Sequence, residues 1–107
     1  MSSIFAGYNQ ADIDAFRKYH ADNKWIWAEF RRFAEQMLTS GRTEYGAKSI
    51  MERIRWEFEL NNPGKEFKIN NDFTALYART LAYNDRRFRD FFEFRQPKGL
   101  TSHREAA

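Results

Sequence analysis

The sequence predicts a mainly α-helical protein that folds as a single compact domain of four or five helices. Three observations support this prediction. Apolar residues recur at the three- and four-residue spacing that places side chains on one face of a helix, most clearly at Phe73, Leu76, Tyr77 and Leu81. Residue types that start or stop helices separate these periodic segments. The length of 107 residues suits one domain with one core.

The periodic part of the chain covers residues 1–95, which we expect to form the helical domain. Pro97 and Gly99 interrupt the pattern, so residues 96–107 are expected to form a flexible C-terminal tail. Eleven Phe, five Tyr and three Trp give this short chain enough large side chains to close a core.

Two start signals and one stop signal organise the first half of the chain. Asn9 predicts the N-cap of a first helix, and Asn23 offers a second start after it. Gly41 then provides a C-terminal stop. The inward-facing residues of this stretch are expected to be Ile13, Phe16, Ile26, Phe30, Phe33 and Met37. Residues 10–39 could form one kinked helix or two.

The next helix is expected to begin after Thr43 and to bury Ala47, Ile50, Met51 and Ile54. Beyond it, Trp56, Phe58 and Leu60 alternate with glutamates at the period of a strand, and a turn signal follows, so residues 56–69 could form a hairpin. The propensities of Glu and Arg favour a helix that continues to about Leu60. We favour the helix, and a short β element near residues 56–69 stays open as the alternative.

Two further helices are expected in the last third of the domain. Asn70 and Asn71 predict the start of a helix that runs to about residue 83. Asp85 then caps a short last helix over residues 86–95, with Phe88, Phe91 and Phe92 facing inward. We expect one core to contain Ile50, Ile54, Phe73, Leu76, Tyr77 and Leu81.

Several aromatic side chains lie off the main apolar faces of the predicted helices. These are Trp25, Trp27, Trp56 and Phe94. Such rings form either a second layer of the core or an exposed patch for a partner. Because aromatic residues make up 18% of the chain, we favour the core layer.

The composition excludes several classes of protein. Without Cys, the chain forms neither a disulfide framework nor a thiolate zinc site, which is typical of a reducing compartment. Residues 1–14 lack the basic and apolar regions of a secretory signal. No apolar run reaches the roughly 18 residues of a membrane helix. We therefore expect a soluble, cytoplasmic protein with no membrane partner.

Motifs for catalysis, metal binding and cofactor binding are absent from the sequence. His20 and His103 are far apart, and neither has a second ligand at metal-binding spacing. The chain contains no Gly-x-Ser-x-Gly elbow and no glycine-rich phosphate loop. We therefore expect no enzyme activity, no catalytic residues, no metal and no cofactor.

Basic residues beside aromatic rings give the main functional signal, in a chain whose net charge is +3. On the last predicted helix, Arg86 and Arg89 are neighbours at i, i+3 and could present guanidinium groups to phosphates. The candidate nucleic-acid contacts are Lys48, Arg55, Arg79, Arg86, Arg87 and Arg89. These residues suggest a small, non-enzymatic nucleic-acid-binding protein.

One structural arrangement would suit this hypothesis, and one alternative function competes with it. The helices between residues 43 and 83 allow a helix-turn-helix-like DNA-binding arrangement, although the connection at residues 61–70 is long for that motif. The alternative is a protein-binding module, such as an inhibitor or regulator that covers an acidic host protein, because arginine and aromatic residues also dominate protein interfaces. The sequence slightly favours nucleic acid, and it leaves the choice of DNA or RNA and the oligomeric state open.

Four short segments of the second half resemble a group of known sequences. The segments are ERIRW at 52–56, FKINN at 67–71, YAR at 77–79 and FFEFR at 91–95. They resemble short uncharacterised proteins of bacteria and their phages. The resemblance implies a phage or mobile-element setting, such as that of a regulator, and it implies neither an activity nor site residues.

Overall fold

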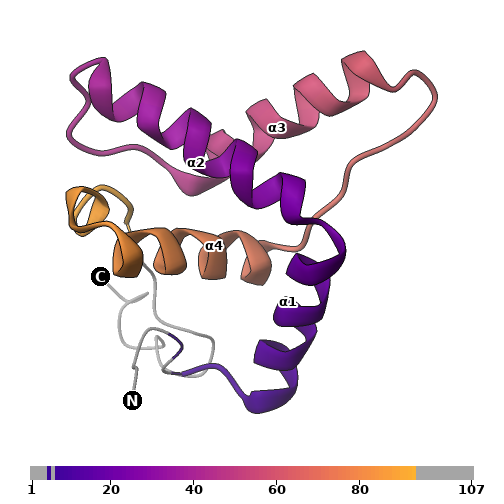
Figure 1. Ribbon diagram of the computed structural model, residues 1–107, viewed down its shortest axis with the longest axis horizontal. Helices are drawn as coiled ribbons and strands as arrows, with labels where there is room; N and C mark the ends of the chain where they lie inside the picture. The colour runs from indigo at the N-terminus through magenta and orange to yellow at the C-terminus, as the bar shows by residue number, and fades with distance from the viewer. Residues whose placement is uncertain (1–4, 6, 94–107) are drawn as a thin grey trace, which may run out of the picture.

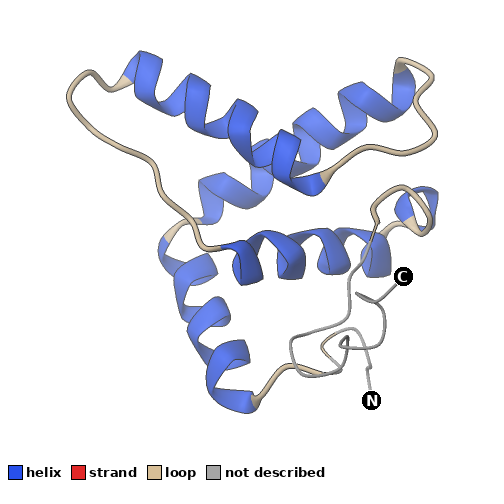
Figure 2. Ribbon diagram, turned by 180° about the vertical axis from the view of Figure 1, so that it is seen from behind, coloured by secondary structure: helices blue, strands red, loops and turns tan. Residues whose placement is uncertain are grey.

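The structure, a computed structural model, describes residue 5 and residues 7–93. This part of the chain forms α1 (Gln10–Asp22), α2 (Lys24–Thr39), α3 (Ala47–Asn61), α4 (Asn71–Asn84) and the 3-10 helix η1 (Arg86–Phe88). Figure 2 shows only helices and loops over the described residues, so the predicted mainly helical fold is confirmed. No described helix is both long and apolar enough to cross a bilayer. Phe94 and the predicted tail at residues 96–107 lie outside the described residues.

Two helices, and not one kinked helix, occupy residues 10–39. The side-chain oxygen of Asn9 accepts the backbone N–H of Asp12 at 2.8 Å and caps α1. Between the helices, Asn23 adopts φ −137° and ψ 51°, which is not helical, and its side-chain amide donates to the Tyr19 carbonyl at 2.9 Å. The chain changes direction at this residue, so α1 and α2 point differently in Figure 1.

Helix α3 continues through residues 56–60, as the helical propensities of this segment predicted, and no hairpin forms there. In the loop of residues 62–70, Gly64 adopts a φ of 87°, which favours glycine. The Glu59 carboxylate accepts the backbone N–H of Phe67 at 3.1 Å and holds the loop against α3. This connection is longer than the turn of three or four residues that is typical of helix-turn-helix motifs.

Helix α4 lies at the centre of the fold, below α2 in Figure 1 and in contact with α2, α3 and η1. Its first turn is capped by Asn70, whose side-chain oxygen accepts the Phe73 backbone N–H at 2.7 Å. The ring centre of Tyr77 lies 4.8 Å from that of Phe16 on α1 and 6.1 Å from that of Phe30 on α2. Burial raises the pKa of the Tyr77 hydroxyl.

The predicted core is confirmed, with two corrections among the outlying rings. Ile50, Ile54, Leu76, Tyr77 and Leu81 are buried in one cluster, against which Phe73 packs half-buried. Trp27 packs half-buried against this core, as expected. Trp25 does not join the core: it stacks on Phe58 with ring centres 5.4 Å apart and is 39% exposed. Trp56 does not join the core, because it lies on the side of α3 that faces away from α2 and α4; its side chain is 66% exposed.

The prediction of an α-helix from residue 86 onward was wrong. Only η1 forms, with the N–H groups of Phe88 and Phe91 donating to Asp85 and Phe88 carbonyls at 2.9 and 3.2 Å. The carbonyl of Phe91 accepts the N–H of Tyr45 at 2.9 Å. Phe88, Phe91 and Phe92 are all buried, as expected. Tight turns, held by a contact from the loop before α3, thus bury the same three rings that a helix would have placed on one face.

Candidate functional site

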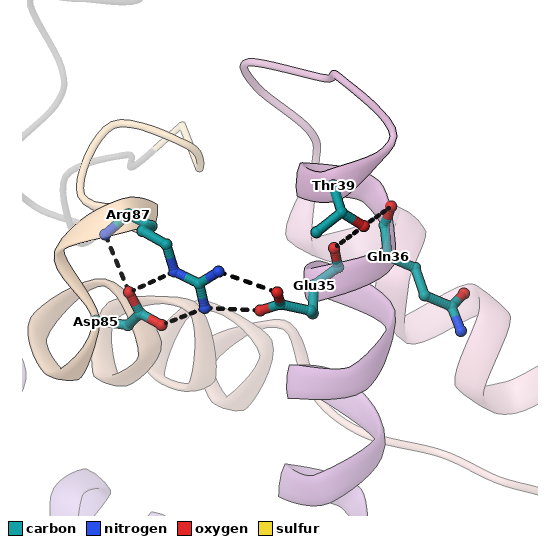
Figure 3. Close-up of polar contacts among 5 residues, drawn as sticks. All are labelled: Glu35, Gln36, Thr39, Asp85 and Arg87. Atoms are coloured by element: carbon teal, nitrogen blue, oxygen red, sulfur yellow. Dashed lines mark hydrogen bonds and ion pairs between the residues drawn. The ribbon is translucent and has the colours of Figure 1, made fainter.

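Arg87, one of the predicted nucleic-acid contacts, is held by two carboxylates. Its guanidinium donates to Glu35 of α2 at 2.9 and 2.7 Å and to Asp85 at 3.1 and 2.8 Å, as Figure 3 shows. The backbone N–H of Arg87 also donates to Asp85 at 3.0 Å. Both carboxylates are therefore bound in the two-bond geometry that suits a guanidinium. We call these three residues the Arg87 clasp.

The hydrogen bonds of the Arg87 clasp shift the pKa values of all three of its residues. Hydrogen bonds from Arg87 hold the pKa values of Glu35 and Asp85 below their usual range, and the positive charge of Arg31 lowers them further. The pKa of Arg87 is raised, mainly by its hydrogen bonds to Asp85 and then by those to Glu35. Arg87 thus links η1 to α2, and a phosphate would have to compete with two carboxylates for it.

Three other predicted contacts are exposed and available. Lys48, Arg86 and Arg89 lie on the surface, and no carboxylate within the described part of the chain pairs with them. Arg86 is the first residue of η1, and Arg89 is its C-cap. The hydrogen bond between Tyr45 and Phe91 places the loop that leads to Lys48 beside the turn that follows Arg89.

The last two predicted contacts, Arg55 and Arg79, are engaged by other side chains. Arg55 pairs with Glu52 at 3.4 Å on the surface of α3. Arg79 is half-buried on α4, and its guanidinium carbon lies 5.7 Å from the ring centre of Tyr8, a cation–π distance. The six predicted residues therefore lie on three elements, and three of the six already contact other side chains.

The side of α3 that faces solvent carries two large apolar residues. Trp56 and Leu60 are each 66% exposed, and they lie one turn apart, so their side chains are neighbours. Ile54, on the opposite side of the helix, is 1% exposed. In Figure 1 the C-terminal half of α3 extends beyond α2 and α4. Adjacent exposed apolar side chains of this size are typical of contact surfaces.

Charges of both signs border this apolar pair. Lys48, Glu52, Arg55 and Glu59 follow one another on one flank, and Arg53 pairs with Glu57 at 3.0 Å on the other. We define the outer face of α3 as Lys48, Ser49, Glu52, Arg53, Arg55, Trp56, Glu59 and Leu60. An apolar centre with a polar border is the usual anatomy of a protein interface.

A shallow groove of about 280 Å³ lies between α2 and α3. Trp25 and Phe58 contribute its apolar wall. At its edge, Arg32 pairs with Glu29 at 2.7 Å, and this hydrogen bond raises the pKa of Arg32. Trp25 in the groove wall is 39% exposed, against 66% for Trp56 and for Leu60, which makes the groove a weaker candidate contact surface than the outer face of α3.

Residue types that bind metals do not cluster in the described part of the chain. Among residue 5 and residues 7–93, no three His, Cys, Asp or Glu side chains gather in a way that could hold a metal ion. His20 is half-buried, with its ring 6.5 Å from Phe16, 6.3 Å from Trp27 and 5.9 Å from Tyr77 between ring centres. His20 therefore packs as an aromatic side chain.

The exposure of Trp56 and Leu60 was missed by the sequence reasoning, although the sequence contained a signal for it. Successive helical residues are rotated by about 100°, so Trp56 lies about 160° and Leu60 about 120° around α3 from the buried Ile54. The signal depends on assigning residues 56–60 to a helix. The strand alternative would have placed Trp56, Phe58 and Leu60 on one face.

No protein-family model, no curated protein and no solved structure matches the chain. The candidate site therefore rests on the geometry above, and the resemblance of residues 52–95 to phage and bacterial sequences remains an expectation.

Proposed function

We propose that the chain is a non-enzymatic protein-binding module and that the outer face of α3 is its contact surface. The observation that supports this most directly is the pair of exposed neighbours Trp56 and Leu60. Tryptophan is among the residues that contribute most to protein interfaces, because its large ring buries much area at a low cost in side-chain entropy. Removing two such side chains from water favours association.

The charges around the apolar pair also fit a protein partner better than a phosphate backbone. Glu52 and Glu59 lie on the same flank as Lys48 and Arg55, so the flank alternates in sign and has no net charge. A nucleic-acid surface is uniformly negative and would be repelled by the two glutamates. A protein surface with both signs can match all four residues.

Site-specific photo-crosslinking in cells of the source organism tests this proposal. Benzoylphenylalanine is placed at Leu60, which keeps Trp56 in the surface, and at Tyr83 as a matched control, because Tyr83 is 64% exposed on a different helix, α4. We expect a discrete protein adduct from position 60 and none from position 83. The absence of any protein adduct at position 60, or an equal yield at both positions, would contradict the proposal.

A second candidate function is nucleic-acid binding, with a phage or mobile-element regulator as its biological form. It is favoured by the three exposed cations Lys48, Arg86 and Arg89, which no described carboxylate neutralises. The site proposed on this basis comprises these three residues, with Arg55, Arg79 and Arg87 as further candidates that would have to leave their present partners. Exposed guanidinium groups at a surface turn suit phosphate contacts.

A salt titration with duplex and single-stranded DNA tests the second candidate. Arg89→Ala should flatten the dependence of log affinity on log salt by about one unit, since one phosphate contact is lost. Arg17→Ala is the matched control, because Arg17 is an exposed arginine on α1, outside the proposed site, and its loss should leave the slope unchanged. No binding of either DNA at low salt would exclude this function.

A further inference from the structure

The outer face of α3 carries a charge pattern that is complementary to itself when reversed. Lys48, Glu52, Arg55 and Glu59 are separated by four, three and four residues, the spacing that keeps side chains in one row along a helix. Along α3 the charges of this row run plus, minus, plus, minus. Along a second copy laid antiparallel they run minus, plus, minus, plus, so every charge meets its opposite.

A two-fold axis between residues 53 and 54 gives this match. It sets Lys48 opposite Glu59 of the other copy, and Glu52 opposite Arg55 in exchange for the pair that these two residues form within one chain. Glu59 keeps its hydrogen bond from the Phe67 N–H, which uses Oε2, and Lys48 of the other copy would approach the same carboxylate from solvent. In an antiparallel pair of helices related by a two-fold axis, a given flank of one helix faces the same flank of the other, so this row meets itself. The symmetry repeats each contact, which gives four ion pairs from four residues of each chain.

The neighbouring row of the outer face supplies the apolar contact. Ser49, Arg53, Trp56 and Leu60 share the same four, three, four spacing. With the same two-fold axis, Arg53 of one copy and Trp56 of the other are offset by two residues, about 3 Å along the helices. A guanidinium that leaves its pair with Glu57 can cover this offset and stack on the indole ring. Leu60 lies near Ser49, a small residue that leaves room for it. Both exposed apolar side chains are therefore covered by the pairing.

The charged residues at the two ends of α3 are placed unfavourably with respect to its helix dipole. Its first turn contains Lys48 and no acidic residue, and its last turn contains no basic residue, while Glu57 and Glu59 lie near the C-terminus. Negative charge is favourable at a helix N-terminus and positive charge at a C-terminus, so an isolated α3 gains nothing from this arrangement. An antiparallel copy places its glutamates near Lys48 and its basic residues near Glu59, and this removes the mismatch.

We propose that the partner of the outer face of α3 is a second copy of this chain, and that two chains form an antiparallel dimer through their α3 helices. This inference rests on the proposed protein-binding function and names its partner. A helix of 15 residues is about 22 Å long, so the contact is smaller than the about 1,200–2,000 Å² of a stable interface unless other elements join it. The dimer is therefore a weak one that dissociates on dilution.

Sedimentation of the full-length chain and two charge variants tests the dimer. The natural chain should shift from monomer to dimer as its concentration rises. Arg55→Glu sets glutamate against Glu52 twice, and Glu52→Arg sets arginine against Arg55 twice, so each variant alone should associate about tenfold more weakly. An equimolar mixture of the two should associate as well as the natural chain, because each variant then supplies the charges that the other lacks.

The mixture separates pairing between chains from effects within one chain, since each variant alone loses the same internal Glu52–Arg55 contact. Circular dichroism of each variant establishes that it folds, and Trp56→Ala, which keeps all four charges, should also weaken association. A natural chain that stays monomeric, or a mixture that associates no better than its components, would overturn the dimer.

The dimer and the proposed function can fail separately. If the chain is monomeric but a foreign protein is crosslinked at position 60, the proposed function stands with a different partner. No protein adduct at position 60 would overturn both.

Discussion

Two segments of this chain combine arginines with aromatic residues, and the fold uses them in opposite ways. In residues 85–92, Phe88, Phe91 and Phe92 are buried and Arg87 is bound by Glu35 and Asp85. In residues 48–60, Trp56 and Leu60 are exposed. Two segments of similar composition therefore differ: residues 85–92 pack into the core, whereas residues 48–60 expose large apolar side chains.

The difference lies in what each segment packs against. The turn of residues 85–92 lies against α4 and is joined to the loop before α3, so its rings have neighbours on several sides. Helix α3 contacts α2 and α4 along the side that carries Ile50 and Ile54, whereas Trp56 and Leu60 on its other side face solvent. A run of arginine and aromatic residues thus indicates a site only where packing leaves it uncovered.

The largest effect is expected from Phe88→Ala in the buried segment. Phe88 is 1% exposed, and its ring packs edge-on against Phe91 with centres 5.3 Å apart. Its truncation should reduce the free energy of unfolding by about 3–5 kcal/mol, since it removes a large buried ring and leaves a cavity. Urea denaturation followed by circular dichroism measures this loss. A change below 1 kcal/mol would mean that the turn contributes little to the core.

A slightly smaller loss is expected from Ile54→Ala, two residues before Trp56 on α3. Ile54 is 1% exposed in the core between the helices. Its truncation should cost about 2–5 kcal/mol in the same urea experiment. Together with Trp56→Ala below, this variant compares the inner side of α3 with its outer face within a single helix. A near-zero change would show that α3 is oriented differently from this structure.

The Arg87 clasp should stabilise the fold at neutral pH and lose this contribution at acidic pH. The folded-state pKa values of Glu35 and Asp85 are lowered, so their contribution is present above their unfolded values of about 4 and is lost as the pH falls through the folded values. Arg87→Met should therefore melt at a lower temperature than the natural chain at neutral pH, with the difference shrinking below about pH 4. Thermal melts from pH 7 to pH 3 measure it.

Arg86→Met is the control for the clasp, because Arg86 is exposed and no described carboxylate pairs with it. This variant should follow the pH dependence of the natural chain. An equal loss of acid dependence in both variants would assign the effect to overall charge and not to the clasp.

The smallest effect on stability is expected from Trp56→Ala. Because its side chain is mostly in water, truncation should change the free energy of unfolding by no more than about 0.5 kcal/mol. Urea denaturation at high dilution, where any dimer has dissociated, gives this value. A loss as large as that of Ile54→Ala would place Trp56 in the core and remove the basis for a contact surface on α3.

The sequence by itself determined much of the helical fold. Asn9 and Asn70 cap α1 and α4 where the sequence predicted, because a cap is a contact between a side chain and a backbone N–H three residues away. The buried faces of the helices also follow from local spacing, which is why Leu76 and Ile54 were placed correctly. The choice of a helix over a hairpin at residues 56–60 followed from propensity.

Only the tertiary structure decided how the candidate site residues are used. Arg87 binds Glu35, which is 52 residues away in the chain, and no local pattern connects the two. The turn at residues 85–92 depends on a hydrogen bond from Tyr45, so its sequence read as a helix when taken alone. The exposure of Trp56 depends on which sides of α3 other helices cover. Local spacing fixes the direction of a side chain on its helix, whereas its neighbours are fixed by contacts between distant parts of the chain.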